Sequence, residues 1–174
     1  MKTPKTMTLT LRVLARLLSY PDDALREHLD ELRHALRTEA ALQPARAAEV
    51  EALIDSLAAQ SAIDAEADYV QLFDSGRRTS LHLFEHVHGD SRDRGPAMID
   101  LAQTFESAGL YLAEGEMPDH LPVVLEYAST QPPREARAFL AEMAHIFNAI
   151  FAALQRQRSP YASVLGALLD LAGE

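Results

Sequence analysis

The chain has 174 residues, of which 48% are hydrophobic and 24% charged, and it contains no cysteine. This length and balance fit one domain with a buried core, residues 1–174, and exclude a disordered chain, a disulfide framework and any site built on thiolates. The formal net charge of −10 argues against nucleic acid as a partner, because neutralising phosphates requires an excess of lysine and arginine, and it suits either a basic partner or solubility alone.

The first twenty residues have some features of an export signal, since two lysines precede the stretch Met-Thr-Leu-Thr-Leu. Arg12 and Arg16 interrupt the apolar stretch, and no small-residue cleavage site follows before Pro21, so we expect no signal peptide. Runs of about 18 apolar residues, which a membrane-spanning helix needs, do not occur in the sequence. We therefore expect a cytoplasmic protein without direct membrane insertion.

Apolar residues recur at every third or fourth position along most of the chain, which is helical spacing. Residues 9–18 predict an opening helix that stops at Pro21, because proline disfavours helical geometry in the residue before it. Residues 25–36 and 50–57 each carry a further apolar stripe. Residues 139–154 continue the pattern over about four turns, which predicts a helix packed into the core.

Prolines and one glycine separate these stripes. We expect Gly109 to end a helix that begins near Asp93, and Ser159 to cap the last helix. No stretch alternates between apolar and polar residues between hairpin turns such as Asn-Gly, so a sheet is not expected. The prediction is an all-α, single-domain bundle of about seven to nine helices with short connections. The prolines expected in first helical turns are Pro44, Pro96, Pro133 and Pro160.

Two irregular stretches, residues 73–96 and 115–122, are where we expect a functional site. Four arginines in the first stretch offer bidentate contacts to carboxylate or phosphate groups. The alternative is that they pair with Asp90, Asp93 and the acidic surface around them. No Gly-rich loop that could cradle a nucleotide phosphate is found. The four arginines are Arg77, Arg78, Arg92 and Arg94.

A zinc-binding pattern also lies in the first stretch. His82, Glu85 and His86 match H-x-x-E-H, in which two histidines one helical turn apart bind zinc and the glutamate activates water. On a helix the three side chains would share a face. A working site needs a third protein ligand, for which Glu106 or Asp90 would be guesses. Structural use of the histidines is the alternative to a zinc hydrolase.

The second stretch, residues 115–122, is typical of a turn followed by the start of a helix. We expect Asp119 to cap that helix and Pro122 to lie in its first turn. This structural interpretation leaves Glu116 and His120 without a role. An acid close to a histidine is suited to acid–base chemistry, but without a nucleophile or metal the pair is a weak indication.

Several segments resemble one known family. Glu116-Met-Pro-Asp-His120 resembles the E-x-P-D-H motif of the chaperones that mature molybdenum oxidoreductases, the family of TorD, DmsD and NarJ, and Tyr69-Val-Gln-Leu-Phe73 resembles its Y-x-x-L-F element. Residues 77–101 and 117–127 are similar to the NarJ branch in particular. The resemblance covers most of the chain and implies a TorD-like fold. Members of that branch commonly continue into a longer C-terminal region, whereas this sequence ends at Glu174, so we expect a truncated or a short member.

The resemblance implies a chaperone without enzymatic activity or a cofactor of its own. Its partner would be the catalytic alpha subunit of respiratory nitrate reductase. The chaperone would bind the N-terminal segment of that subunit, a remnant of a twin-arginine leader, keep the apoenzyme competent for molybdenum cofactor insertion, and delay membrane attachment. Proteins that deliver the cofactor are further candidate partners. In physical terms this is recognition of an amphipathic peptide in a groove between helices.

For such a groove we predict an apolar surface with a polar rim. The histidines of the rim suggest the hypothesis that peptide affinity depends on pH, since their charge changes near neutrality. Core packing is the alternative role for the aromatic residues. A zinc hydrolase and a general helical peptide-binding adaptor remain alternative functions. The predicted apolar residues are Tyr69, Phe73, Phe84, Met98 and Leu121, and the predicted polar residues are Glu85, His86, His88, Glu116, Asp119 and His120.

Overall fold

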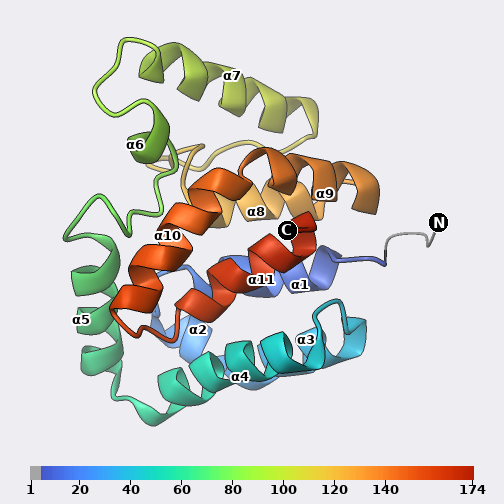
Figure 1. Cartoon of the computed structure of the whole chain (residues 1–174), viewed down its shortest axis with the longest axis vertical. Coiled ribbons are helices and arrows are strands. Elements are labelled where there is room, and N and C mark those ends of the chain that lie inside the picture. The colour runs from blue at the N-terminus through green and yellow to red at the C-terminus, as the bar shows by residue number, and fades with distance from the viewer. Residues whose placement is uncertain (1–4) are drawn as a thin grey trace.

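The computed structural model describes residues 5–174, so residues 1–4 of the predicted domain and of the stretch compared with an export signal lie outside the described residues. Within residues 5–174 the chain forms helices and no strand, as predicted for an all-α protein (Figure 1). The helices are α1 (Thr8–Leu17), α2 (Asp23–Glu27), α3 (Leu29–Glu39), α4 (Pro44–Ala59), α5 (Ala62–Phe73), α6 (Phe84–Val87), α7 (Arg94–Ser107), α8 (Leu121–Ser129), α9 (Pro133–Glu142), α10 (Ala144–Arg156) and α11 (Ala162–Ala172).

Six helices close into a ring around one core. α1 packs between α8 and α3, α3 packs on α4, α4 on α11, α11 on α9, and α9 on α8, while α10 lies along α11 (Figure 1). α11 is buried on all sides from Ala162 to Leu168, as expected of a helix that is apolar around its whole circumference. Leu14, Leu125 and Phe147 are fully buried in the same core, and each such side chain stabilises the fold by about 1.5–3 kcal/mol.

The predicted number of helices is too low because two of the helices are very short. Nine of the helices in residues 5–174 have nine residues or more, whereas α2 and α6 have five and four, too few to show a helical period. The stripe at residues 25–36 is divided between α2 and α3 at His28, whose backbone (φ −106°, ψ 10°) leaves helical geometry. α1 ends at Leu17, before Pro21 as predicted.

The apolar pattern at residues 139–154 belongs to two helices, so the single predicted helix is wrong. α9 and α10 meet at Met143 with a bend of 65°. The Met143 N–H donates to the carbonyl of Leu140, three residues back, and this tighter turn redirects the chain without interrupting the apolar spacing. Within the described residues, no single helix has both the length and the hydropathy to cross a membrane, although α9 and α10 taken together have the required length and composition.

The helix boundaries test the predicted capping residues. Pro44 and Pro133 stand in the first turns of α4 and α9 as predicted. Ser159 accepts the N–H of Tyr161 in the turn before α11 and does not cap the helix itself. One helix is capped by a distant residue, which no local sequence motif indicates. Glu39, the last residue of α3, accepts the N–H groups of Thr10 and Leu9 in the first turn of α1, at 2.7 and 3.0 Å.

α6 and α7 form an outlying layer at one end of the molecule (Figure 1). Phe105 is the one residue of α7 that is fully buried. α7 begins at Arg94 and is ended by Gly109, as predicted, because Gly109 takes the left-handed conformation (φ 84°) and the following N–H of Leu110 returns to the Phe105 carbonyl at 2.9 Å. The chain then returns to the ring at residue 120, beside α6.

Candidate functional site

The two irregular stretches meet in a short antiparallel bridge between His82 and His120. The N–H of Leu83 donates to the Asp119 carbonyl at 3.0 Å, and the N–H of Leu121 donates to the Leu81 carbonyl at 2.8 Å. These bonds fasten the segment before α6 to the segment before α8. Residues predicted in two separate stretches therefore form one structure.

Asp119 is fully buried, with 0% of its surface exposed. Its Oδ2 accepts the N–H of Phe84, the first residue of α6, at 3.1 Å. The prediction that Asp119 caps α8 is wrong, because the bridge turns its carboxylate towards α6 and His120 takes the N-cap position of α8 without a side-chain bond. Pro122 lies in the first turn of α8, as predicted.

His82 faces the second oxygen of this buried carboxylate. Its Nδ1 lies 3.6 Å from Asp119 Oδ1, an atom with no hydrogen-bond partner among the described residues. The Asp119 carboxylate raises the pKa of His82. Burial by itself would raise the pKa of Asp119, but His82 and the Phe84 N–H outweigh it, so the pKa lies below its usual value. The contact is therefore an ion pair whenever His82 is protonated.

His120 stacks on His82, with ring centroids 4.8 Å apart and an angle of 24° between the planes. Burial, with a further contribution from the positive charge of His82, lowers the pKa of His120 to about 4. Of the two stacked rings, His82 is thus the one that takes up a proton first as pH falls, and His120 remains neutral until pH approaches 4.

The zinc interpretation receives no support from this arrangement. His82 lies in the bridge ahead of α6, so it does not share a helical face with Glu85 and His86 as the pattern predicted. The Nε2 of His86 lies 2.8 Å from the Ser80 carbonyl and must donate a proton to it, since that oxygen only accepts. Throughout residues 5–174, no group of three or more histidine, aspartate or glutamate side chains could hold a metal ion.

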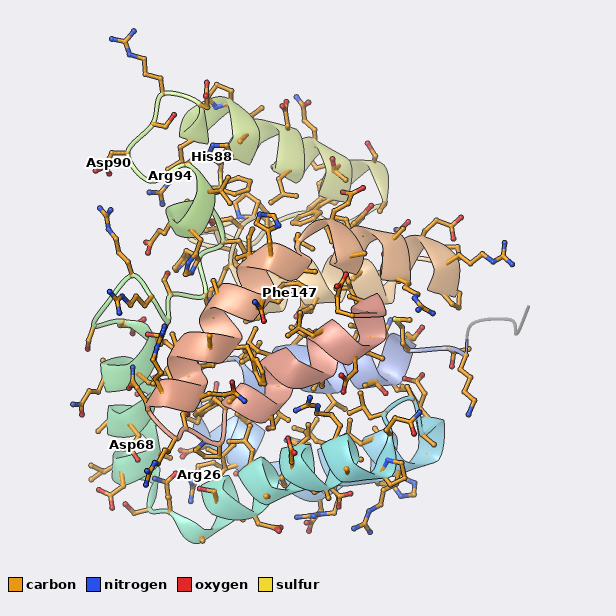
Figure 2. All side chains as sticks on the ribbon, in the orientation of Figure 1. Arg26, Asp68, His88, Asp90, Arg94 and Phe147 are labelled. Carbon is orange, nitrogen blue, oxygen red and sulfur yellow. The ribbon has the colours of Figure 1, made fainter. Side chains whose placement is uncertain are left out.

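A polar cavity of about 540 Å³ opens beside the bridge. Its lining includes His82 and Glu85 together with Phe73, and it carries both acidic and basic side chains. Arg77 pairs with the Asp90 carboxylate at 3.6 Å, as the alternative interpretation proposed. Figure 2 shows Asp90, Arg94 and His88 gathered around the turn between α6 and α7.

Of the other three predicted arginines, only Arg94 lies at the cavity. Arg94 lines the cavity and donates to the Gly89 carbonyl at 3.3 Å. Arg78 and Arg92 are exposed and do not contribute to the lining. The four arginines therefore do not converge on one anion, because the structure brings only Arg77 and Arg94 to the cavity.

The predicted apolar residues separate into core and surface positions. Tyr69 and Phe73 are only 5% and 4% exposed and pack against each other and Tyr161, and Leu121 is fully buried. The Tyr69 hydroxyl donates to the Leu18 carbonyl at 2.7 Å. These three residues therefore lie in the core, which is the alternative role named above, although Phe73 also lines the cavity. Peptide binding by them stays a prediction.

Phe84 and Met98 are partly buried, and they are the predicted apolar residues nearest to solvent. Phe84 makes an edge-to-face contact with His88, with ring centroids 5.1 Å apart. Glu116 is not brought to the polar cavity; it is exposed and lines a small separate cavity of about 40 Å³ beside Phe105. The sequence motif around Glu116 therefore contributes its second half, Asp119 and His120, to the bridge.

The sequence profile of the nitrate reductase delta subunit family matches residues 18–165. The chain belongs to this family. It is 44% identical over 162 residues to the nitrate reductase molybdenum cofactor assembly chaperone NarJ of Escherichia coli, an alignment that covers 93% of this chain and 69% of NarJ. It is also 37% identical over 163 residues to NarW of the same organism, covering 94% of this chain and 68% of NarW.

The fold is also similar to that of a solved structure. A crystal structure from Archaeoglobus fulgidus, described as a redox enzyme maturation protein, superposes with a TM-score of 0.70 and covers 100% of this chain and 98% of that one, at 18% identity. At that identity the likeness shows the fold alone, and it agrees with the TorD-like bundle expected from the sequence.

Proposed function

We propose that this member of the nitrate reductase delta subunit family is an assembly chaperone for nitrate reductase. It binds the N-terminal segment of the catalytic alpha subunit and supports molybdenum cofactor insertion before membrane attachment. The observation that carries the proposal is the 44% identity to E. coli NarJ over 93% of this chain, because NarJ is named as the chaperone for that assembly. A relation of this extent covers the helical body as well as the motif before α8.

The proposed clients are the N-terminal peptide and the apoenzyme that carries it, with cofactor delivery proteins as further partners in the cytoplasm. The role is binding without chemistry. Asp119 is occupied as the cap of α6, and His86 is occupied by the Ser80 carbonyl, so both groups hold the backbone in place. They act as positioning residues, since they fix the segment from which Glu85 and His88 project.

The polar cavity is the proposed contact for basic groups of the peptide. Glu85 and Asp90 line it, and carboxylates at the rim of a groove bind arginine through charge-assisted hydrogen bonds. Phe84 and Met98 are partly buried and are the apolar surface proposed for the other face of an amphipathic peptide, with His88, whose ring contacts Phe84, on the polar rim. Tyr69, Phe73 and Leu121 lie in the core, and Phe73 also lines the polar cavity.

Isothermal titration calorimetry tests the peptide contact. The titrant is a synthetic peptide of about fifteen residues from the N-terminus of the cognate alpha subunit, and a scrambled peptide is the control. We expect only the native sequence to bind, and Glu85→Gln to weaken it about five- to tenfold, the loss expected for one charge-assisted bond of about 1–1.4 kcal/mol. Glu106→Gln, an exposed acid on α7 outside the cavity, is the matched control and should leave the affinity unchanged.

The same titration separates the proposal from a general peptide-binding adaptor. An adaptor would bind the native and scrambled peptides equally. Equal loss of affinity in Glu85→Gln and Glu106→Gln would place the contact outside the polar cavity, because only Glu85 lines it.

A further inference from the structure

A further cavity, of about 310 Å³, opens between α1 and α8, which lie side by side (Figure 1). Arg12 and Arg16 of α1 line it on one side, and Ser129 and Thr130 line it at the end of α8. Leu110, which follows α7, is its apolar lining residue. The cavity shares no lining residue with the polar cavity beside the bridge, and the proposed function makes no use of it.

The segment that supplies the two arginines is basic, although the protein as a whole is acidic. Residues 1–21 contain four of the 16 lysines and arginines and none of the 26 acidic residues. Arg12 and Arg16 lie one helical turn apart and are both exposed, so their like charges repel each other. Positive charge that is concentrated in this way attracts an anion.

Neither of these arginines is paired with an acid. Arg33, Arg46 and Arg77 each form an ion pair with a carboxylate. Arg12 and Arg16 form none with any residue in the described range 5–174. Because a bound anion would relieve the repulsion between the two guanidinium groups, the pair is suited to hold one.

Ser129 holds one of the guanidinium groups in place. It is only 4% exposed, and its Oγ accepts the Nε–H of Arg12 at 3.3 Å and donates to the Glu126 carbonyl at 2.6 Å. The Thr130 hydroxyl donates to the Tyr127 carbonyl at 2.7 Å. The two hydroxyls therefore take up carbonyls at the end of α8, and the terminal nitrogens of Arg12 keep their N–H groups for a ligand.

Glu126 is the one acid that lines this cavity. Burial and the nearby Glu116 raise the pKa of its carboxyl by more than the two arginines lower it. Attraction by the arginines therefore does not dominate at this carboxyl, although it is close enough to feel them. A bound anion has to compete with Glu126 for the arginines, which favours an anion with more than one negative charge.

We propose that this cavity binds the phosphate group of an organic phosphate, with Arg12 and Arg16 on its oxygens and Leu110 against its organic part. A phosphate monoester has three terminal oxygens and nearly two negative charges near neutral pH, enough for both arginines. A carboxylate has only two oxygens, which one arginine fork occupies. Soluble phosphate esters present this group, and phospholipid headgroups present it as a singly charged diester.

The test is NMR titration of the full chain with phenyl phosphate, followed through the backbone amides of Leu110, Ser129 and Thr130. We expect saturable shifts with a Kd on the order of 1 mM at low ionic strength. Inorganic phosphate should bind about fivefold more weakly, because it buries no apolar surface against Leu110. Benzoate, which has the ring but a single negative charge, should also bind at least about fivefold more weakly.

Variants locate the site. Arg16→Gln should weaken phenyl phosphate at least about tenfold through loss of a charged hydrogen bond. Arg134→Gln, which removes the same charge at an exposed position of α9 outside the lining, should change the Kd less than about twofold. Glu126→Gln removes the competing carboxylate and should tighten binding about threefold. Shifts that do not saturate, equal losses in Arg16→Gln and Arg134→Gln, or equal binding of benzoate and phenyl phosphate would each overturn the proposal.

Vesicles distinguish the two sources of the phosphate group. Sedimentation with phosphatidylglycerol vesicles but not with phosphatidylcholine vesicles, lost in Arg16→Gln, would identify the ligand as an anionic lipid headgroup. Binding of phenyl phosphate without sedimentation would identify it as a soluble phosphate ester. Either result supports the site, and the absence of both overturns it.

The phosphate site does not depend on the proposed function, because neither arginine lines the polar cavity. Arg16→Gln should therefore bind the alpha-subunit peptide with the affinity of the wild type. A peptide affinity that falls together with the affinity for phenyl phosphate would place both ligands in one site and would overturn a separate phosphate site.

Discussion

Removing the buried carboxylate of Asp119 should loosen the segment that carries α6. In Asp119→Ala the N–H of Phe84 loses its acceptor inside a buried site, and His82 loses its counter-ion. An unpaired buried N–H, formerly bonded to a charged group, costs about 1.5–3 kcal/mol. We therefore expect Asp119→Ala to lower the free energy of unfolding by about 2–3 kcal/mol.

Asp119→Asn separates the hydrogen bond from the charge, since the amide oxygen still accepts the Phe84 N–H. The depressed pKa of Asp119 contributes stability that is present above about pH 4 and lost as pH falls through its folded pKa. The raised pKa of His82 contributes stability that is present below about pH 6.5 and lost as pH rises through its folded pKa. The ion pair is thus strongest between about pH 4 and 6.5, and Asp119→Asn should cost about 1 kcal/mol at pH 5.5 and less at pH 8.

Urea unfolding followed by circular dichroism at pH 5.5 and pH 8 measures both variants, and amide exchange at Phe84 reports whether α6 opens separately from the ring. We expect faster exchange at Phe84 in Asp119→Ala than in the wild type. A loss of stability in Asp119→Asn that is larger at pH 8 than at pH 5.5 would refute the ion-pair reasoning, and an unchanged Phe84 exchange rate in Asp119→Ala would refute the cap.

Three further substitutions test other contacts. His120 stays neutral in the fold, with a pKa of about 4, so the unfolded chain binds a proton that the folded chain does not, and the free energy of unfolding falls as pH drops from about 6.5 to 4. The free energy of unfolding of His120→Gln, measured by thermal melts relative to the wild type, should therefore be about 1–2 kcal/mol more favourable at pH 5 than at pH 7.5. A difference between variant and wild type that is the same at both pH values would contradict this. Glu39→Gln should cost about 1 kcal/mol in urea unfolding, because it removes the charge that caps α1, while the exposed Glu31→Gln on α3 should cost less than about 0.5 kcal/mol. Tyr69→Phe removes the bond to the Leu18 carbonyl and should cost about 1 kcal/mol without changing peptide affinity; a tenfold loss of affinity would instead place Tyr69 in direct contact with the peptide.

The parts of the fold that follow from local sequence were predictable. Apolar spacing with a proline at its start predicts α4, and Gly109 predicts the end of α7, as the structure confirms. The bend at Met143 was not predictable, because the apolar spacing continues across it while only one turn of backbone tightens. Periodicity reports which face is buried, not whether the helix axis is straight.

The site was predictable in composition but not in geometry. Motif resemblance selected Asp119 and His120, yet their partners, Phe84 and His82, lie more than thirty residues away in the chain. A carboxylate next to a helix start is normally assigned to that helix, and only the bridge between residues 82 and 120 shows that Asp119 caps α6 instead. The same bridge explains why H-x-x-E-H does not lie on one helical face.

The central claim, that this chain is an assembly chaperone for nitrate reductase, is tested most directly by the molybdenum content of the alpha subunit isolated from cells that lack their own chaperone. The account predicts that expressing this chain restores molybdenum to the isolated subunit, and that Glu85→Gln restores less than Glu106→Gln. An alpha subunit that stays free of molybdenum while the folded chain is present at the wild-type level would contradict the account.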